Sequence, residues 1–101
     1  MVLVNARSAS CAEFLALDLQ RAGATVVGER TAGAADSTTA FVALPFGYGL
    51  QVTTALVADL GGVGVARAVV PDVIVVDAAM ALTEGRDPVL EAALEVLGGA
   101  R

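Results

Sequence analysis

The chain has 101 residues, of which 56% are hydrophobic and 17% charged, and its formal net charge is −5. All six basic residues are scattered arginines, so no basic cluster exists and nucleic acid is excluded as a partner. The sequence also excludes an internal disulfide, because it has one cysteine, and a membrane span, because no apolar run reaches roughly 18 residues. A chain with this share of apolar residues is expected to expose a large apolar face. Another part of a domain, or a second copy of the chain, would cover that face.

The first third of the chain is expected to form a strand, a helix and a second strand. Residues 2–5 and 25–29 are short apolar runs, and residues 10–22 between them have helical periodicity that ends at Gly23. The face predicted to turn inward carries Cys11, Leu15, Leu19 and Ala22. The opposite face carries Glu13, Gln20 and Arg21. A strand, a helix and a strand in so few residues predict the βαβ unit of a parallel sheet, and therefore an α/β fold.

A β-hairpin is expected next. Residues 30–38 are rich in small residues and are predicted to be a loop. Residues 39–44 and 50–57 are predicted strands, and the turn between them, residues 45–49, contains a proline and two glycines. The glycine-rich residues 59–64 are predicted to form a second turn.

The last third of the chain is expected to hold one strand and two helices. Residues 73–76 are a β-branched run after Pro71 and Asp72, and residues 78–82 are predicted to begin a helix. The final helix has Asp87 as its predicted N-cap, Pro88 at its first position and Gly98-Gly99 at its end.

Ser10 is the candidate nucleophile. It precedes the first predicted helix, with Glu13 three residues later, which is the pattern of a capping box. The same position suits catalysis, because free N–H groups and the positive end of the helix dipole can stabilise an oxyanion. Capping and attack compete for one hydroxyl, and the local pattern alone favours capping. Attack also requires a base, and the chain contains neither histidine nor lysine.

Several short motifs follow one another in a characteristic order along the chain. They are Val2-Leu3-Val4-Asn5, Ser8-Ala9-Ser10 with Glu13, Val26-Val27-Gly28-Glu29, Thr31-Ala32-Gly33, Pro71-Asp72-Val73 and Asp87-Pro88. From Val2 to about Leu97, this order resembles the second half of the catalytic domain of the tail-specific proteases. These enzymes are also called carboxyl-terminal processing peptidases, and the tricorn protease core is a relative. The resemblance implies that Ser10 is the nucleophile and that the fold is a ClpP/crotonase-like βαβ core with an added β-hairpin.

The chain departs from this family at the base. In the processing peptidases a lysine follows Thr-x-Gly, and here that position is Ala34. The tricorn-like branch uses a histidine from an earlier part of the domain, supported by a serine and a glutamate. The segment that would hold the glutamate, residues 65–68, contains no acid, and the Gly-rich segment that donates part of the oxyanion hole is missing. The resemblance therefore implies the lysine-free branch, with a base outside these residues.

Structural roles are favoured for the other polar residues. Glu29 is expected to be a solvated or hydrogen-bonded strand end, Asp36 a solvated loop residue, and Cys11 a packing residue on the inward side of its helix. The chemical alternatives are substrate contact for Glu29, orientation of a base for Asp36 and thiol chemistry for Cys11. No cluster of histidine, cysteine and acidic residues predicts a metal, and no cofactor is expected.

These observations lead us to expect that residues 1–101 are the C-terminal segment of a serine peptidase catalytic domain whose N-terminal part is absent. The substrate would be a peptide or protein. The isolated chain would be inactive and would need that N-terminal part or a second copy. The alternative is a non-catalytic module on the same fold that binds a peptide or an apolar ligand, as the related interphotoreceptor retinoid-binding protein does. No signal peptide is predicted, so the chain as it stands is expected in the cytoplasm, although relatives are often exported.

Overall fold

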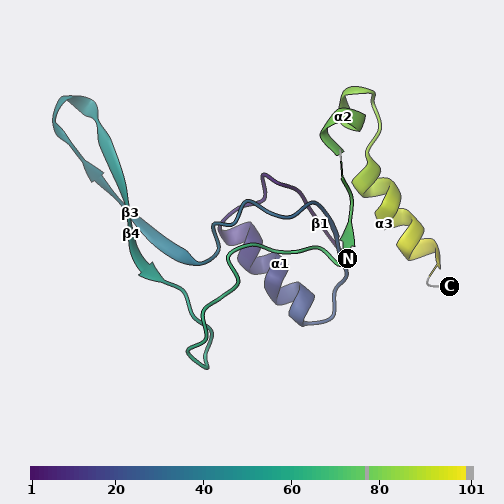
Figure 1. The fold of residues 1–101 in the computed structure, drawn as a ribbon, viewed down its shortest axis with the longest axis horizontal. Helices are drawn as coiled ribbons and strands as arrows, with labels where there is room; N and C mark the ends of the chain where they lie inside the picture. The colour runs from purple at the N-terminus through teal and green to yellow at the C-terminus, as the bar shows by residue number, and fades with distance from the viewer. Residues whose placement is uncertain (77, 100–101) are drawn as a thin grey trace.

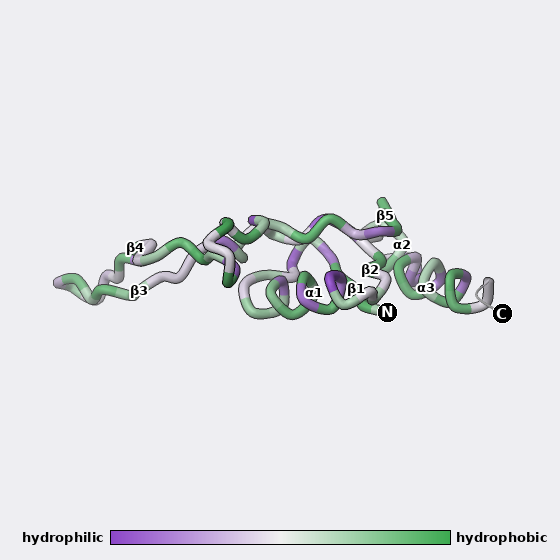
Figure 2. Tube along the Cα trace, turned by 90° about the horizontal axis from the view of Figure 1, so that it is seen from below, coloured by the Kyte–Doolittle hydropathy of each residue, from purple (hydrophilic) through white to green (hydrophobic). Residues whose placement is uncertain are grey.

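The computed structural model describes residues 1–76 and 78–99 (Figure 1). The elements in chain order are β1 (Val2–Val4), α1 (Cys11–Arg21), β2 (Val26–Gly28), β3 (Ser37–Ala43), the short 3-10 helix η1 (Pro45–Gly47), β4 (Gly49–Leu56), β5 (Val73–Ile74), α2 (Ala78–Thr83) and α3 (Pro88–Gly99). The molecule is flat, with extents of 56 × 39 × 14 Å. The β3–β4 hairpin forms one end, the small sheet with α1 lies in the middle, and α3 forms the other end (Figures 1 and 2).

The central sheet is parallel and has the strand order β1-β2-β5. Val2 pairs with Val26, and Val27 pairs with Val73, so the predicted βαβ unit and the α/β fold class are confirmed. The middle strand, β2, is buried along its whole length. Its last residue must be glycine, because Gly28 has a φ of +135° and a Cβ there would lie 1.9 Å from the carbonyl oxygen of Val4.

Asp72, in the Pro-Asp motif, joins three elements at the amino end of β2. Its carboxylate accepts hydrogen bonds from the N–H of Val26 at 2.8 Å and from the side-chain amide of Gln20 at 3.1 Å. The N–H of Asp72 donates to the carbonyl of Val26 at 2.9 Å. Asp72 therefore aligns β5 with β2 and holds α1 against both strands.

Helix α1 begins and ends close to its predicted positions, but its predicted inward face is wrong. Cys11 and Leu15 are exposed, and Leu15 keeps 61% of its surface accessible. The buried residues are Glu13, Ala16 and Leu17. With Gln20, these positions also have helical spacing, so periodicity alone allowed either face. Their polar side chains suggested the outer face, whereas in the structure Glu13 finds buried hydrogen-bond partners and Gln20, at the edge, bonds Val70 and Asp72.

The core around α1 is small. It consists of Val4, Ala16, Leu17, Val26, Ala35 and Val69, with Val2, Phe14 and Val65 packed at its edge. The accessible surface of the chain is 6950 Å², whereas a compact protein of this mass exposes about 5,300 Å². The large apolar surface expected from composition is therefore present in the structure.

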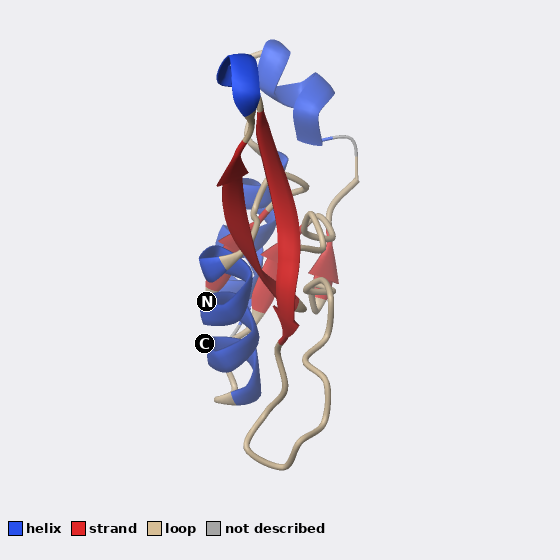
Figure 3. Ribbon diagram, turned by 90° about the vertical axis from the view of Figure 1, so that its left-hand side faces the viewer, coloured by secondary structure: helices blue, strands red, loops and turns tan. Residues whose placement is uncertain are grey.

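The β3–β4 hairpin contributes much of that surface. It has the predicted turn, and its strands pair antiparallel from Ser37 opposite Leu56 to Ala43 opposite Gly49. Figure 3 shows the two strands as long red arrows that run side by side. Every residue of β4 is exposed, and Phe46 at the tip keeps 97% of its surface accessible. Residues 37–56 contain no charged side chain.

The later elements are close to their predicted positions, with two differences in length. Strand β5 ends two residues earlier than predicted, at Ile74, and α3 continues through both glycines predicted to end it. Asp87 caps α3 as predicted, because its Oδ1 accepts the N–H of Leu90 at 3.0 Å. Within residues 1–76 and 78–99, no helix is long and apolar enough to cross a membrane.

Candidate active site around Ser10

Ser10 has an unusual backbone conformation, with φ 55° and ψ −123°. A positive φ is uncommon for a residue with a side chain, and this ψ lies outside the small left-handed region that such residues tolerate. Ser10 is exposed at the sharp turn between the loop after β1 and the start of α1. Strained turns between a strand and a helix are one way in which hydrolases present a serine hydroxyl.

The Ser10 hydroxyl is not held by a regular helix cap. The reciprocal pattern of a capping box is present, but Ser10 makes no regular side-chain cap hydrogen bond. The N–H groups of Glu13 and Phe14 donate to the Ser10 carbonyl at 2.9 and 3.1 Å. The other part of the capping box is a short hydrogen bond from the N–H of Ser10 to Oε2 of Glu13, at 2.8 Å. Backbone groups and Glu13 therefore provide the hydrogen bonds at this end of α1, while the Ser10 side chain stays in the capping-box position facing the N–H of Glu13.

The N–H of Cys11 is a candidate oxyanion donor. Cys11 follows Ser10 and is the first residue of α1, so its N–H lies at the positive end of the helix dipole. Within the described parts of the chain, no hydrogen bond uses this N–H. An N–H group directly after a serine nucleophile is well placed to stabilise the oxyanion that forms on attack.

Several hydrogen bonds hold the loop before Ser10. Asn5 and Ser8 bond reciprocally: Oδ1 of Asn5 accepts the N–H of Ser8 at 3.1 Å, and Oγ of Ser8 accepts the N–H of Asn5 at 3.1 Å. Glu29 accepts the N–H of Ala6 at 3.2 Å, which confirms its interpretation as a hydrogen-bonded strand end. The N–H of Ala32 donates to the carbonyl of Ser8 at 3.0 Å. The loop is therefore tied both to the end of β2 and to the segment that follows it.

Glu13 lies at the centre of the site and is completely buried. Its Oε1 accepts the hydroxyl of Thr31 at 2.5 Å and the N–H of Gly33 at 2.8 Å. Its Oε2 accepts the N–H groups of Ser10 and Ala34, both at 2.8 Å. Burial alone would raise the pKa of Glu13, but the hydrogen bonds from Thr31, Gly33, Ala34 and Ser10 together hold that pKa below its ordinary value. Glu13 is therefore an ionised, fully occupied acceptor and a poor general base.

Residue 34 lies beside Ser10. The backbone nitrogens of Ser10 and Ala34 are both 2.8 Å from the same oxygen atom, Oε2 of Glu13, so they are separated by no more than twice that distance. Ala34 is exposed, as Ser10 is. A longer side chain at position 34 would therefore start next to Ser10, which is the arrangement that the resemblance to a serine–lysine pair requires.

The other candidate residues have different environments from those expected. Asp36 is not simply solvated, because its Oδ2 forms an ion pair with Nε of Arg67 at 3.1 Å. The interpretation of Cys11 as a packing residue is wrong, because the side chain is exposed next to Ser10. Within residues 1–76 and 78–99, no three histidine, cysteine or acidic side chains lie close enough to hold a metal ion.

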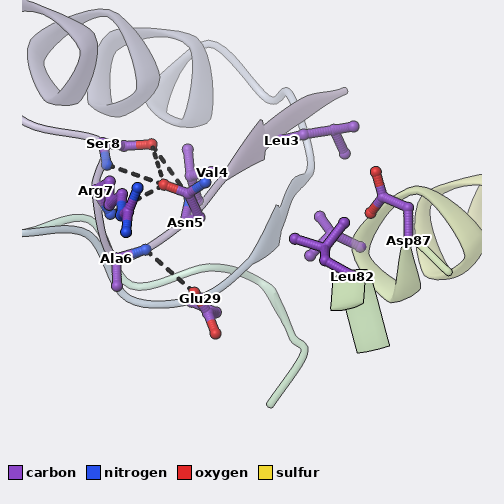
Figure 4. A pocket seen from close by; sticks show the side chains of 10 residues that line it. Leu3, Val4, Asn5, Ala6, Arg7, Ser8, Glu29, Leu82 and Asp87 are labelled. Carbon is purple, nitrogen blue, oxygen red and sulfur yellow. Dashed lines mark hydrogen bonds between the residues drawn. The ribbon is translucent and has the colours of Figure 1, made fainter. Parts of the chain in front are cut away.

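A hollow of about 570 Å³ lies beside the loop that leads to Ser10. Leu3 on β1 and Leu82 on α2 line it from facing sides, and Ser8, Arg7 and Glu29 lie along the loop edge (Figure 4). The lining combines apolar side chains with a few polar groups, as small binding sites do. The hollow is large enough for an amino-acid side chain or a small apolar ligand.

Sequence reasoning missed Thr31. The Thr-x-Gly motif contributed only to the resemblance, yet the Thr31 side chain is buried and bonds both Glu13 and the N–H of Val69, the latter at 2.8 Å. A threonine in a loop of otherwise small residues is a weak signal for burial. Only the presence of both Thr31 and Glu13 among the motifs that carry the resemblance could have indicated a shared role.

The fold and the site together define an α/β domain that presents a serine hydroxyl at the start of a helix. Comparison with known families identifies this as a serine-type peptidase domain. The chain belongs to Peptidase family S41, whose sequence model matches residues 1–75, from β1 through β5. No curated protein and no solved structure matches the chain.

Proposed function

We propose that the chain is the serine-bearing, C-terminal segment of the catalytic domain of a tail-specific or tricorn-like peptidase, with Ser10 as its nucleophile. The observation that carries the proposal is the conformation of Ser10. Its backbone is held at positive φ, its side chain is exposed, and the adjacent N–H of Cys11 has no partner among the described residues. Family membership supports peptide-bond hydrolysis as the reaction.

The chemistry at Ser10 has one part inside the chain and one part outside. Oγ of Ser10 attacks the carbonyl carbon of a peptide bond and forms a tetrahedral adduct, while the N–H of Cys11 donates to the oxygen that becomes negative. The hydroxyl proton passes to a base, which later returns it to the leaving amine. The acyl-enzyme is then hydrolysed by water, which frees Ser10.

The base comes from outside residues 1–101. The chain has no histidine and no lysine, and both oxygens of Glu13 are already occupied. We assign this role to a histidine on preceding polypeptide, as in the tricorn-like branch, so the 101 residues alone are expected to be inactive. The same polypeptide would supply a second oxyanion donor and would cover part of the exposed apolar surface.

The test is covalent labelling of the natural polypeptide that carries this chain. A fluorophosphonate is expected to modify Ser10 and to inhibit peptide hydrolysis, and peptide mapping by mass spectrometry locates the adduct. Ser10→Ala should abolish both labelling and hydrolysis. Ser37→Ala, at the start of the hairpin, is the matched control and should leave both unchanged. Unaltered hydrolysis in Ser10→Ala would show that the nucleophile lies elsewhere.

The second candidate function is a non-catalytic module that binds a peptide or an apolar ligand, and the partly apolar hollow favours it. Saturable binding of an apolar fluorophore, weakened by Leu82→Ser and unaffected by Ser10→Ala, would support this function. Absence of labelling by the fluorophosphonate would further support a non-catalytic role. Failure to bind any such ligand would count against the module.

A further inference from the structure

We propose that Glu13 and Thr31 form a positioning pair that holds Ser10 in the conformation needed for attack. The inference rests on the proposed role of Ser10 as the nucleophile. It explains why the turn at Ser10 is strained and identifies the residues that maintain the strain. Neither residue touches the substrate in this proposal; both act through the backbone of Ser10.

The argument begins with the two peptide groups on either side of the Ser10 Cα. The N–H before it donates to Oε2 of Glu13 at 2.8 Å. The carbonyl after it accepts the N–H groups of Glu13 and Phe14 in the first turn of α1. Because the rotations φ and ψ relate these two peptide groups, fixing both fixes the backbone of Ser10. Without the carboxylate, only the carbonyl side would be held, and φ could relax to a negative value, which costs less energy.

Glu13 can act as a brace because it is itself fixed from several sides. Thr31, Gly33 and Ala34 donate three hydrogen bonds from the segment after β2. The Thr31 hydroxyl in turn accepts the N–H of Val69, so the network reaches a third segment, next to β5. Within the described chain, no arginine forms an ion pair with Glu13, so neutral donors alone stabilise this buried charge.

The geometry specifically requires a carboxylate. Each oxygen of Glu13 accepts two hydrogen bonds, and each lies 2.5 to 2.8 Å from its donors. In a glutamine, the amide NH₂ would face two of these donors in place of an acceptor. In an aspartate, the side chain is one methylene shorter and could not keep all four contacts. Glutamine preserves the size of Glu13 without its charge, and aspartate preserves the charge without the size. Either substitution is therefore expected to disrupt the network.

A purely structural role for Glu13 predicts a different result from a positioning role. If Glu13 only stabilised α1, its loss would lower the folded fraction but would leave the reactivity of each folded molecule unchanged. If Glu13 positions Ser10, the folded molecules should bind a probe normally and react with it slowly. The separation of binding from the chemical step therefore distinguishes the two roles.

The experiment measures inactivation by a fluorophosphonate in the natural polypeptide, normalised to the folded fraction. It compares Glu13→Gln, Thr31→Val and Thr31→Ser with Asp18→Asn, a control on the exposed side of α1. Glu13→Gln should lower the maximal inactivation rate about 100-fold with little change in probe affinity, because small misplacements of a reacting group have effects of this size. Thr31→Val should lower the rate about tenfold. Thr31→Ser, which retains the hydroxyl, should restore it, and Asp18→Asn should have no effect.

A crystal structure of Thr31→Val provides a second measurement that does not depend on labelling. Ser10 is expected to leave the positive-φ region in this variant. Persistence of φ near 55° would overturn the proposed brace, whatever the rate. Wild-type inactivation rates in folded Glu13→Gln would also overturn it, while leaving Ser10 as the nucleophile. By contrast, labelling that survives Ser10→Ala would refute the proposed function, and the structure of Thr31→Val would then decide the positioning role by itself.

Discussion

The turn at Ser10 and the tip of the β3–β4 hairpin each contain a non-glycine residue with positive φ, and the contrast between them is informative. Phe46, at the tip, has φ 63° and ψ 22°, which lies in the left-handed region that tight turns use. It is 97% exposed and is followed by Gly47, which also has positive φ. Ser10 has φ 55° with ψ −123°, outside that region, and a buried carboxylate holds its N–H.

The difference shows that an unusual dihedral angle acquires meaning from what holds it in place. The conformation of Phe46 follows from a local turn and needs no contact with the rest of the molecule. The conformation of Ser10 depends on segments about 20 and 60 residues further along the chain, through Glu13, Thr31 and Val69. Strain of this kind persists only where the surrounding structure maintains it, and it clusters at functional sites.

Removing the Glu13 side chain should have the largest effect on stability. Glu13→Ala leaves the N–H groups of Ser10, Gly33 and Ala34 and the hydroxyl of Thr31 without their acceptor. We expect the free energy of unfolding to fall by about 3 kcal/mol or more, measured by urea denaturation. Asp18→Ala on the exposed side of α1 is the control and should change it little. Equal effects for the two variants would contradict the contrast between the buried and exposed regions.

Gly28 in β2 and Gly47 in the hairpin tip both have positive φ, so substituting each of them compares the buried and the exposed region again. Gly28→Ala would place a Cβ 1.9 Å from the Val4 carbonyl oxygen, so we expect a loss of about 3 kcal/mol or failure to fold. Gly47→Ala in the hairpin tip meets no atom within 4 Å, so only the cost of positive φ remains, about 1 kcal/mol. Thermal unfolding of both variants measures the difference. A larger loss for Gly47→Ala would reverse the expected order.

A lysine beside Ser10 tests whether the turn is prepared for catalysis. In the 101-residue chain, Ala34→Lys should increase the rate of fluorophosphonate labelling of Ser10 about tenfold or more, because an amine next to the hydroxyl can accept its proton. Ala32→Lys adds the same charge two residues away and serves as the control. If both variants label at the same rate, position 34 has no special relation to Ser10.

The pH dependence of stability should reflect Glu13. Its pKa is lower in the folded chain than its ordinary value of 4.5, so its contribution is complete above that pH and is lost as the pH falls through the folded pKa. The difference in unfolding free energy between wild type and Glu13→Gln should therefore be constant at neutral pH and shrink on acidification below about 4.5. Urea denaturation over this range is the measurement, and a difference that grows on acidification would contradict the assigned direction.

The smallest effect is expected at the hairpin tip. Phe46→Gly removes the cost of positive φ and exposes no buried surface, because the Phe46 side chain is already in solvent. The melting temperature should stay the same or rise slightly, corresponding to about 0.5 kcal/mol. A marked fall in melting temperature would indicate that the Phe46 ring is covered by something in solution.

Much of the fold could be predicted from local sequence, because strands, turns and caps are local in origin. The apolar runs around residues 2–5 and 25–29, the hairpin turn and the Asp87 cap all lie where their patterns place them. The inward face of α1 could not be predicted, since a glutamate is assigned to the outside unless its buried donors are known. Those donors come from residues 31–34, whose position beside α1 depends on the parallel pairing of β1 and β2.

For the candidate site too, sequence order predicts one part and tertiary contacts determine the rest. The assignment of Ser10 as the nucleophile rests on the resemblance and on its place before a helix, both features of sequence order, and it remains a prediction. The role of Thr31 and the closeness of Ala34 to Ser10 depend on contacts between distant segments, so no local pattern announces them. The tail-specific subfamily and the histidine base remain predictions from the resemblance.

The exposed position of Cys11 has a practical consequence for inhibitor profiling. Its thiol is the single one in the chain and stands one residue after Ser10. An alkylating reagent such as iodoacetamide, once attached to this sulfur, would sterically obstruct the serine without reacting with it. With Ser10 as the proposed nucleophile, inactivation by such reagents would imitate a cysteine peptidase, and a Cys11→Ala background is needed before the pattern of inhibitors is used to assign the catalytic type.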